Sequence, residues 1–252
     1  MKKVVDKVVF GFLILVSCIS NAQSNAKQIV TEEKTFFAYI NQTRLSKRFG
    51  IWTDLHLRTK DQFVNRLHQS LGRIGVTYYL TNDLRFTFAY CFAYNFPEEG
   101  FKAHRVEHRP WQQIFFKQEY HKVQTIQMLR LEERYIQNVV NDVATNDYSY
   151  KTRLRYSYMV LFPFTKNGIQ PKSVFGVLNN EVFFNFGKNV IYNVFDQNRF
   201  FAGAGYQVNK ASSVHLGYMN IYQQLDAGNK YTNSHCIRLF FYHNIDFRKE
   251  KS

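Results

Sequence analysis

The stretch Leu84–Asn95, LRFTFAYCFAYN, repeats with a period of two residues. Every second position holds a large apolar or aromatic side chain, and the positions between them hold mostly small or polar ones. Side chains along a β-strand point alternately to the two faces of a sheet. The stretch therefore predicts a strand that lies between two unlike environments.

The same alternation recurs on both sides of this stretch, in Ile51–Arg58 and in Tyr148–Phe162. Short and long connections alternate along the chain, which is typical of barrels that cross an outer membrane. The sequence thus predicts an all-β fold, a single antiparallel up-and-down β-barrel of the outer-membrane type with about 10–12 strands. Eleven strands can be drawn, over residues 35–46, 50–58, 63–80, 84–96, 111–121, 123–135, 148–164, 173–186, 199–208, 212–223 and 234–247.

The composition excludes several other classes of protein. The 252 residues carry a net charge of +14 and include 25 Phe and 17 Tyr. Disordered chains contain few aromatic residues, and collagen-like chains need far more Gly and Pro than the 12 and 4 of this sequence. No apolar run approaches the length of a membrane-spanning helix, which is about 18–20 residues.

The N-terminal residues have the features of an export signal. Lys2, Lys3 and Lys7 form a basic start, the apolar stretch Val8–Ser17 follows, and small residues precede a cleavage site after Ala22. Residues 1–22 are therefore predicted to be a signal peptide, with a lipoprotein signal at Cys18 as the alternative. Export directs the predicted barrel to the outer membrane of a Gram-negative bacterium.

The rest of the chain divides into a barrel domain, residues 35–248, and a polar tail, residues 249–252. With eleven strands, the first one would begin on the side of the membrane that faces away from the periplasm. Residues 23–34 are therefore predicted to form an extra strand or a plug in the lumen. The two remaining cysteines, Cys91 and Cys236, are either packed core residues or one long-range disulfide.

Charged side chains gather on one face of the predicted strands. A membrane barrel turns its polar face to the lumen, whereas a soluble lipocalin-like barrel turns its apolar face inward. Charges of both signs in the middle of strands, together with the export signal, favour the membrane barrel. Two interpretations stay open: a basic constriction that selects anions, or an ion-pair network that closes a narrow barrel. The predicted lumen network consists of Asp54, Arg130, Glu132, Arg134, Lys151, Arg153, Arg155, Glu181, Arg199 and Arg238.

His104, Glu107 and His108 match the zinc-binding pattern H-x-x-E-H. The pattern needs a helix to bring both histidines to one metal ion, and these residues fall in a predicted loop, 97–110, between two prolines. They are a weak loop candidate, and we expect no metal and no cofactor. His215 shares a strand face with Ser213 and is the candidate base of a lipid hydrolase, but a lone histidine predicts no enzyme.

Several short strings carry a family resemblance when they are taken in order. They are Asn41–Arg44 (NQTR), Trp52 with Asp54, Pro110–Gln113 (PWQQ), Arg130–Arg134 (RLEER), Phe195–Arg199 (FDQNR) and Gly217–Asn220 (GYMN). Together they resemble the bacterial family catalogued as domain of unknown function 2490, over about residues 35–248. The resemblance implies a secreted outer-membrane β-barrel, and it transfers no catalytic residue because the family defines none.

These features predict an outer-membrane barrel that serves as a channel or binding barrel for small polar or anionic solutes. The alternatives are a closed structural barrel that anchors envelope components, a barrel-borne lipid hydrolase, and a soluble lipocalin-like binder. Expected partners are outer-membrane lipid, including lipopolysaccharide, and the machinery that inserts barrels, since the last strand, Ile237–Phe247, ends on an aromatic residue. Export and charges that face a lumen argue against nucleic acid as a partner.

Overall fold

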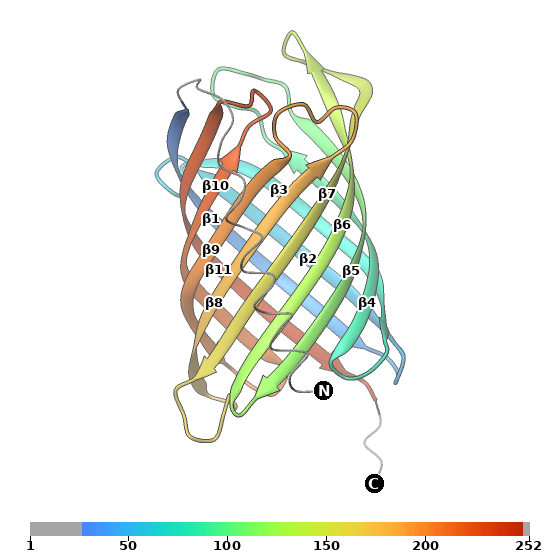
Figure 1. Cartoon of the computed structure of the whole chain (residues 1–252), viewed down its shortest axis with the longest axis vertical. Helices are drawn as coiled ribbons and strands as arrows, with labels where there is room; N and C mark the ends of the chain where they lie inside the picture. The colour runs from blue at the N-terminus through green and yellow to red at the C-terminus, as the bar shows by residue number, and fades with distance from the viewer. Residues whose placement is uncertain (1–26, 249–252) are drawn as a thin grey trace, which may run out of the picture.

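The structure, a computed structural model, describes residues 27–248 as a closed barrel of eleven strands (Figure 1). This confirms the predicted all-β barrel and its strand number. Within the described residues no helix is long and apolar enough to cross a membrane. The strands are β1 (Gln28–Arg44), β2 (Phe49–Lys60), β3 (Arg66–Tyr79), β4 (Leu84–Asn95), β5 (Arg105–Tyr120), β6 (Val123–Val140), β7 (Val143–Pro163), β8 (Ser173–Phe186), β9 (Phe195–Gln207), β10 (Ser212–Gln224) and β11 (Lys230–Asp246).

The barrel closes through a parallel seam between β1 and β11. Strands that follow one another in sequence are antiparallel, so an odd number of them leaves the first and the last running in the same direction. The seam runs without a break from Gln28 opposite Lys230 to Arg44 opposite Asp246. The predicted antiparallel pairing is therefore wrong at the seam and correct at all the remaining strand interfaces. In Figure 1, β1 begins at the upper end of the barrel and the chain leaves β11 at the lower end.

Residues 28–34 form the first part of β1 and are neither an extra strand nor a plug. Their backbone pairs with residues 230–236 of β11. This pairing gives the backbone N–H and C=O groups of residues 28–34 hydrogen-bond partners. The predicted signal peptide, residues 23–26 and the polar tail 249–252 lie outside the described residues.

The longest loops predicted between strands are all shorter in the structure, and two of them change the course of β5, β6 and β7. The segment 136–147 is a hairpin of β6 and β7 that projects at the upper end (Figure 1), with a turn at Asn141 and Asp142, whose φ angles are +51° and +58°. Asn and Asp tolerate such angles better than most residues. The predicted loop 97–110 ends early because β5 begins at Arg105. Pro110 lacks an N–H group, and only the pairing with β6 is interrupted there.

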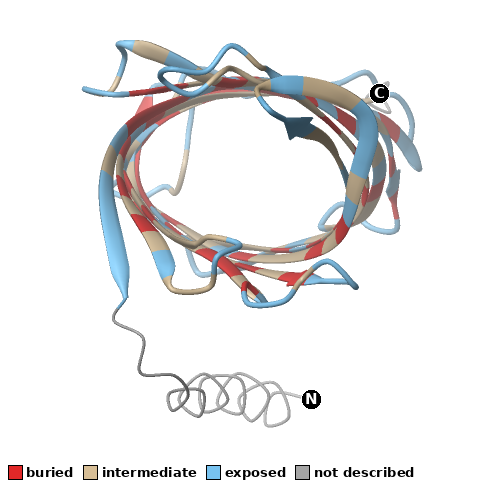
Figure 2. Cartoon of the chain, turned by 90° about the horizontal axis from the view of Figure 1, so that it is seen from above, coloured by how far each residue is buried: buried red, intermediate tan, exposed pale blue. Residues whose placement is uncertain are grey.

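The two faces of the barrel are inverted relative to those of a water-soluble protein. Figure 2 shows buried and exposed segments that alternate along the strands. Large apolar side chains on the outer face are open, with Leu55 65%, Phe88 64% and Ile74 62% exposed. Charged side chains of the inner face are buried, so the predicted orientation of the strands is correct.

The interior also contains two hydrophobic clusters, which hold the two cysteines. Cys236 packs in a cluster with Phe36, and Cys91 packs in another with Trp52. Both thiols are free and buried. Of the two roles considered for them, the structure therefore shows packed core residues.

Candidate functional site

Strands β6 and β7 bring residues of the predicted lumen network face to face inside the barrel. Arg130 lies opposite Arg155, Glu132 opposite Arg153, and Arg134 opposite Lys151. Two of these pairs are cation against cation. Each therefore needs a carboxylate from elsewhere, because an unpaired buried charge is costly.

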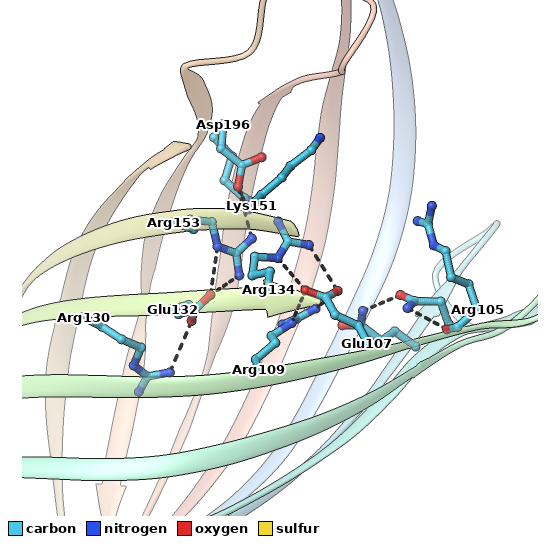
Figure 3. Close-up of polar contacts among 12 residues, drawn as sticks. Arg105, Glu107, Arg109, Arg130, Glu132, Arg134, Lys151, Arg153 and Asp196 are labelled. Atoms are coloured by element: carbon cyan, nitrogen blue, oxygen red, sulfur yellow. Dashed lines mark hydrogen bonds and ion pairs between the residues drawn. The ribbon is translucent and has the colours of Figure 1, made fainter. Parts of the chain in front are cut away.

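Glu132 lies at the centre of this network (Figure 3). Arg153 donates from Nε to Glu132 Oε2 at 2.9 Å and from Nη1 to Asp196 Oδ2 at 3.1 Å. Arg130 Nη1 lies 3.7 Å from Glu132 Oε1, and its Nε donates to Gln113 Oε1 at 2.9 Å. One carboxylate thus links β6 to β7, and Arg153 extends the link to β9.

Glu107 forms a second centre on β5, where the zinc pattern had been considered. Its carboxylate binds Arg109 Nε at 2.6 Å and Arg134 Nη2 at 3.2 Å. His108, the next residue in the strand, points outward and pairs with Tyr90, while His104 stacks on Tyr94 with ring centroids 5.0 Å apart. Glu107 and His108 point to opposite faces of β5, and His104 precedes the strand. Across residues 27–248, no group of three His, Cys, Asp or Glu side chains could hold a metal ion.

Asp54 anchors the opposite side of the lumen, on β2. It accepts hydrogen bonds from Trp52 Nε1 at 2.6 Å and from Arg73 Nη1 at 3.2 Å. His56 Nε2 lies 3.2 Å from its other oxygen. Both hydrogen bonds end on the same carboxylate oxygen, Oδ2, which holds Arg73 against the wall.

The basic row of β7 is neutralised in the structure. Lys151 Nζ lies 2.7 Å from Asp226, Arg153 contacts Glu132 and Asp196, and Arg155 pairs with Glu181. A basic constriction built from this row, which was one reading of the sequence, is therefore not what these three residues form. They cross-link strands.

The lumen arginines Arg58, Arg199 and Arg238 form no ion pair with a carboxylate among the described residues. Their polar partners are neutral: Gln69 at 2.7 Å, Gln197 at 3.0 Å and the Tyr242 hydroxyl at 3.0 Å, respectively. Each also stacks on aromatic rings, such as Arg238 on Phe201 at 4.1 Å. Their charges remain available to a ligand.

Among the described residues, two cavities lie one above the other in the lumen. The upper one measures about 400 Å³, and nine Lys or Arg side chains line it against four carboxylates. The lower one measures about 130 Å³. They share a wall formed by Phe36, Arg58, Arg73, Arg155 and Arg199. The upper cavity is therefore strongly cationic, and its floor is made of arginine and one aromatic ring.

Sequence reasoning missed four members of this site. Arg58 continues the alternation of Trp52, Asp54 and His56, Arg73 lies in a strand whose two faces are both mixed, and Arg109 falls within the predicted loop 97–110. Asp196 and Gln197 are neighbours in sequence, yet a register shift between Phe183 and Phe184 lets both side chains reach the interior. The alternation of Trp52, Asp54, His56 and Arg58 was a usable signal for Arg58. No feature of the sequence predicts the register shift between Phe183 and Phe184.

His215, the candidate hydrolase base, points into the lumen. Ser213 Oγ lies 3.5 Å from its Nε2, and its ring packs against Tyr242 with centroids 4.5 Å apart. Its Nδ1 has no hydrogen-bond partner among the described residues. A catalytic triad needs an acid at that nitrogen to orient the imidazole, and no acid forms a hydrogen bond with it among the described residues.

Comparison with known proteins yields one match. No curated protein and no solved structure matches this chain. A family match covers residues 33–232, which is most of the barrel. The chain therefore belongs to the family described as "Protein of unknown function (DUF2490)".

Proposed function

We propose that this protein is an outer-membrane β-barrel whose lumen binds small anions and lets them pass. The proposal has two parts, a location in lipid and a selectivity for negative charge. Each part is supported by a separate feature of the barrel.

The outer face supports the location. Water-exposed apolar side chains around a whole barrel are costly, and lipid removes that cost. Tyrosine–histidine pairs also lie on the outer face towards both ends: Tyr218 with His235 at 2.6 Å towards the upper end, and Tyr39 with His243 at 2.9 Å towards the lower end. Amphipathic rings at two levels are typical of the two membrane interfaces.

The charge of the upper cavity is the observation that carries the proposed selectivity. Nine cations face four carboxylates there, and the lower cavity also has more arginines than acids. Rings of Lys and Arg select anions in membrane pores, because their field attracts negative ions and repels positive ones. A cavity of about 400 Å³ suits a small solute.

A closed structural barrel is the second candidate, and the ion-pair network favours it. Glu132, Glu107 and Glu181 tie neighbouring strands together across the interior. Such cross-links, with Phe36 in the wall between the cavities, would stiffen a barrel that conducts nothing.

Outer-membrane fractionation and planar-bilayer conductance test the proposal. The folded protein should migrate faster before boiling than after it and should be absent from the soluble periplasm. In a potassium chloride gradient, its reversal potential should have the sign of chloride selectivity. A folded membrane barrel without conductance would support the structural candidate. A soluble protein without a mobility shift would contradict both.

A further inference from the structure

We infer that Arg58 and Arg199, which both stack on the ring of Phe36, form a binding site for one small oxyanion at the wall between the two cavities. The inference rests on the proposed anion-selective lumen and assigns it a specific site. The ligand class is an anion with several oxygen acceptors, for which inorganic phosphate is the simplest probe.

The first argument is that donors are left over at this point. A guanidinium group has five N–H donors. The hydrogen bond to Gln69 uses Nη1 of Arg58, and its Nε is buried without a partner among the described residues. The Nε of Arg199 donates to Gln197 Oε1, which leaves the other donors of this group for a ligand. An oxyanion could accept from both groups, and such charge-assisted bonds are strong.

The second argument is electrostatic. The strongest charge interaction of Arg58 is repulsion from Arg199, followed by repulsion from Arg109 and Arg73. Glu181 attracts Arg199, but its own bonds go to Arg155 and Asn179. Buried charges are normally paired, and the other arginines of this wall do have acids: Arg73 has Asp54, and Arg155 has Glu181. A bound anion would neutralise the two that do not.

The third argument is geometry. The guanidinium carbon of Arg58 lies 4.4 Å from the centre of the Phe36 ring, and that of Arg199 lies 5.8 Å from it. Arg58 comes from β2, Phe36 from β1 and Arg199 from β9. Both arginines line both cavities, so an anion held between them can be reached from the upper cavity and released to the lower one.

Calorimetric titration of the folded full-length protein in detergent with inorganic phosphate tests the site. Arg58→Gln and Arg199→Gln should each weaken phosphate binding by about tenfold or more, since each removes charge-assisted hydrogen bonds. Arg85→Gln is the matched control. Arg85 also lacks a carboxylate partner among the described residues and stacks on Phe115 at 3.6 Å, but it lines neither cavity. It should leave phosphate affinity unchanged.

The mobility shift on boiling shows which variants have folded. If Arg58→Gln does not fold, Arg199→Gln tests the site independently, and Arg58→Lys preserves the charge with fewer donors and should bind phosphate at an intermediate affinity. Absence of phosphate binding by the wild type, or equal weakening by Arg85→Gln, overturns the site.

Conductance separates the two proposals. Phosphate binding without conductance supports the site and overturns the channel, whereas anion conductance without phosphate binding overturns the site and leaves the channel standing.

Discussion

The carboxylate of Glu132 lies between two guanidinium groups, with Arg153 Nε 2.9 Å from one oxygen and Arg130 Nη1 3.7 Å from the other. All three side chains are more than nine-tenths buried. Attraction within such a cluster offsets the free energy needed to remove the charges from water. The loss of one member therefore leaves the remaining buried charges uncompensated and destabilises the fold. Single residues therefore have large effects in this lumen.

Glu132→Gln should destabilise the folded barrel by about 3–5 kcal/mol, because it leaves Arg153 and Arg130 with too little negative charge. Urea unfolding followed by the mobility shift measures the loss. The control is Glu133→Gln, on the opposite face of β6 and without an ion pair among the described residues. It should change the stability by less than about 0.5 kcal/mol. Similar losses in both variants would show that Glu132 is not a centre of the network.

At the scale of elements, the connection between β4 and β5 is held by the tip of the β6–β7 hairpin. The backbone N–H groups of Lys102 and Ala103 donate to the Asp142 carboxylate at 2.9 Å and 2.8 Å. These hydrogen bonds lower the pKa of Asp142 below its ordinary value. One exposed carboxylate thus fastens two elements of the upper end to each other.

This contact should depend on pH. Because the folded pKa of Asp142 is depressed, the contact is fully present above the ordinary aspartate pKa of about 3.9 and weakens as pH falls through the lower, folded pKa. Hydrogen-exchange protection of the Lys102 and Ala103 amides, corrected for intrinsic rates, should therefore drop at acidic pH. Asp142→Asn should show the same low protection at pH 7. Asp147→Asn, on the same hairpin, should not; equal behaviour of the two variants would exclude the assigned contact.

At the scale of the whole molecule, the parallel seam sets the shape of the barrel. It places the start of β1 and the end of β11 at opposite ends, and it pairs Phe37 with Leu239 on the outer face. A twelfth strand between β1 and β11 would separate these two residues. The seam is thus the feature that distinguishes this barrel from an even-numbered one.

The double variant Phe37→Cys with Leu239→Cys should form a disulfide under mild oxidation, because paired positions bring the Cβ atoms within reach of each other. The bond would close a loop and change the mobility of the boiled, unreduced protein. Phe37→Cys with Ile245→Cys keeps both residues on the same strands but six positions out of register, and it should not cross-link. Cross-linking of the second pair in place of the first would refute the parallel register.

The candidate site was predictable only in its general character. The alternation in residues 148–162 placed Arg153 and Arg155 on the inner face, which is where they lie. Which arginine would be neutralised was not predictable, because the acids that neutralise them come from other strands. Asp196 reaches Arg153 across 43 positions, and Asp226 reaches Lys151 across 75. Arg58 and Arg199, left without acids, became distinctive only once these contacts were known.

By itself, the sequence determined the strands and their two faces, since the period of two in stretches such as Leu84–Asn95 reflects the local geometry of an extended backbone. Composition and alternation likewise sufficed for a barrel with a charged interior. The tertiary structure alone decided the parallel seam, the place of residues 28–34 and the pairing of the lumen charges. The reason is that hydrogen bonds and ion pairs join groups distant in sequence, and a local pattern carries no record of its partners.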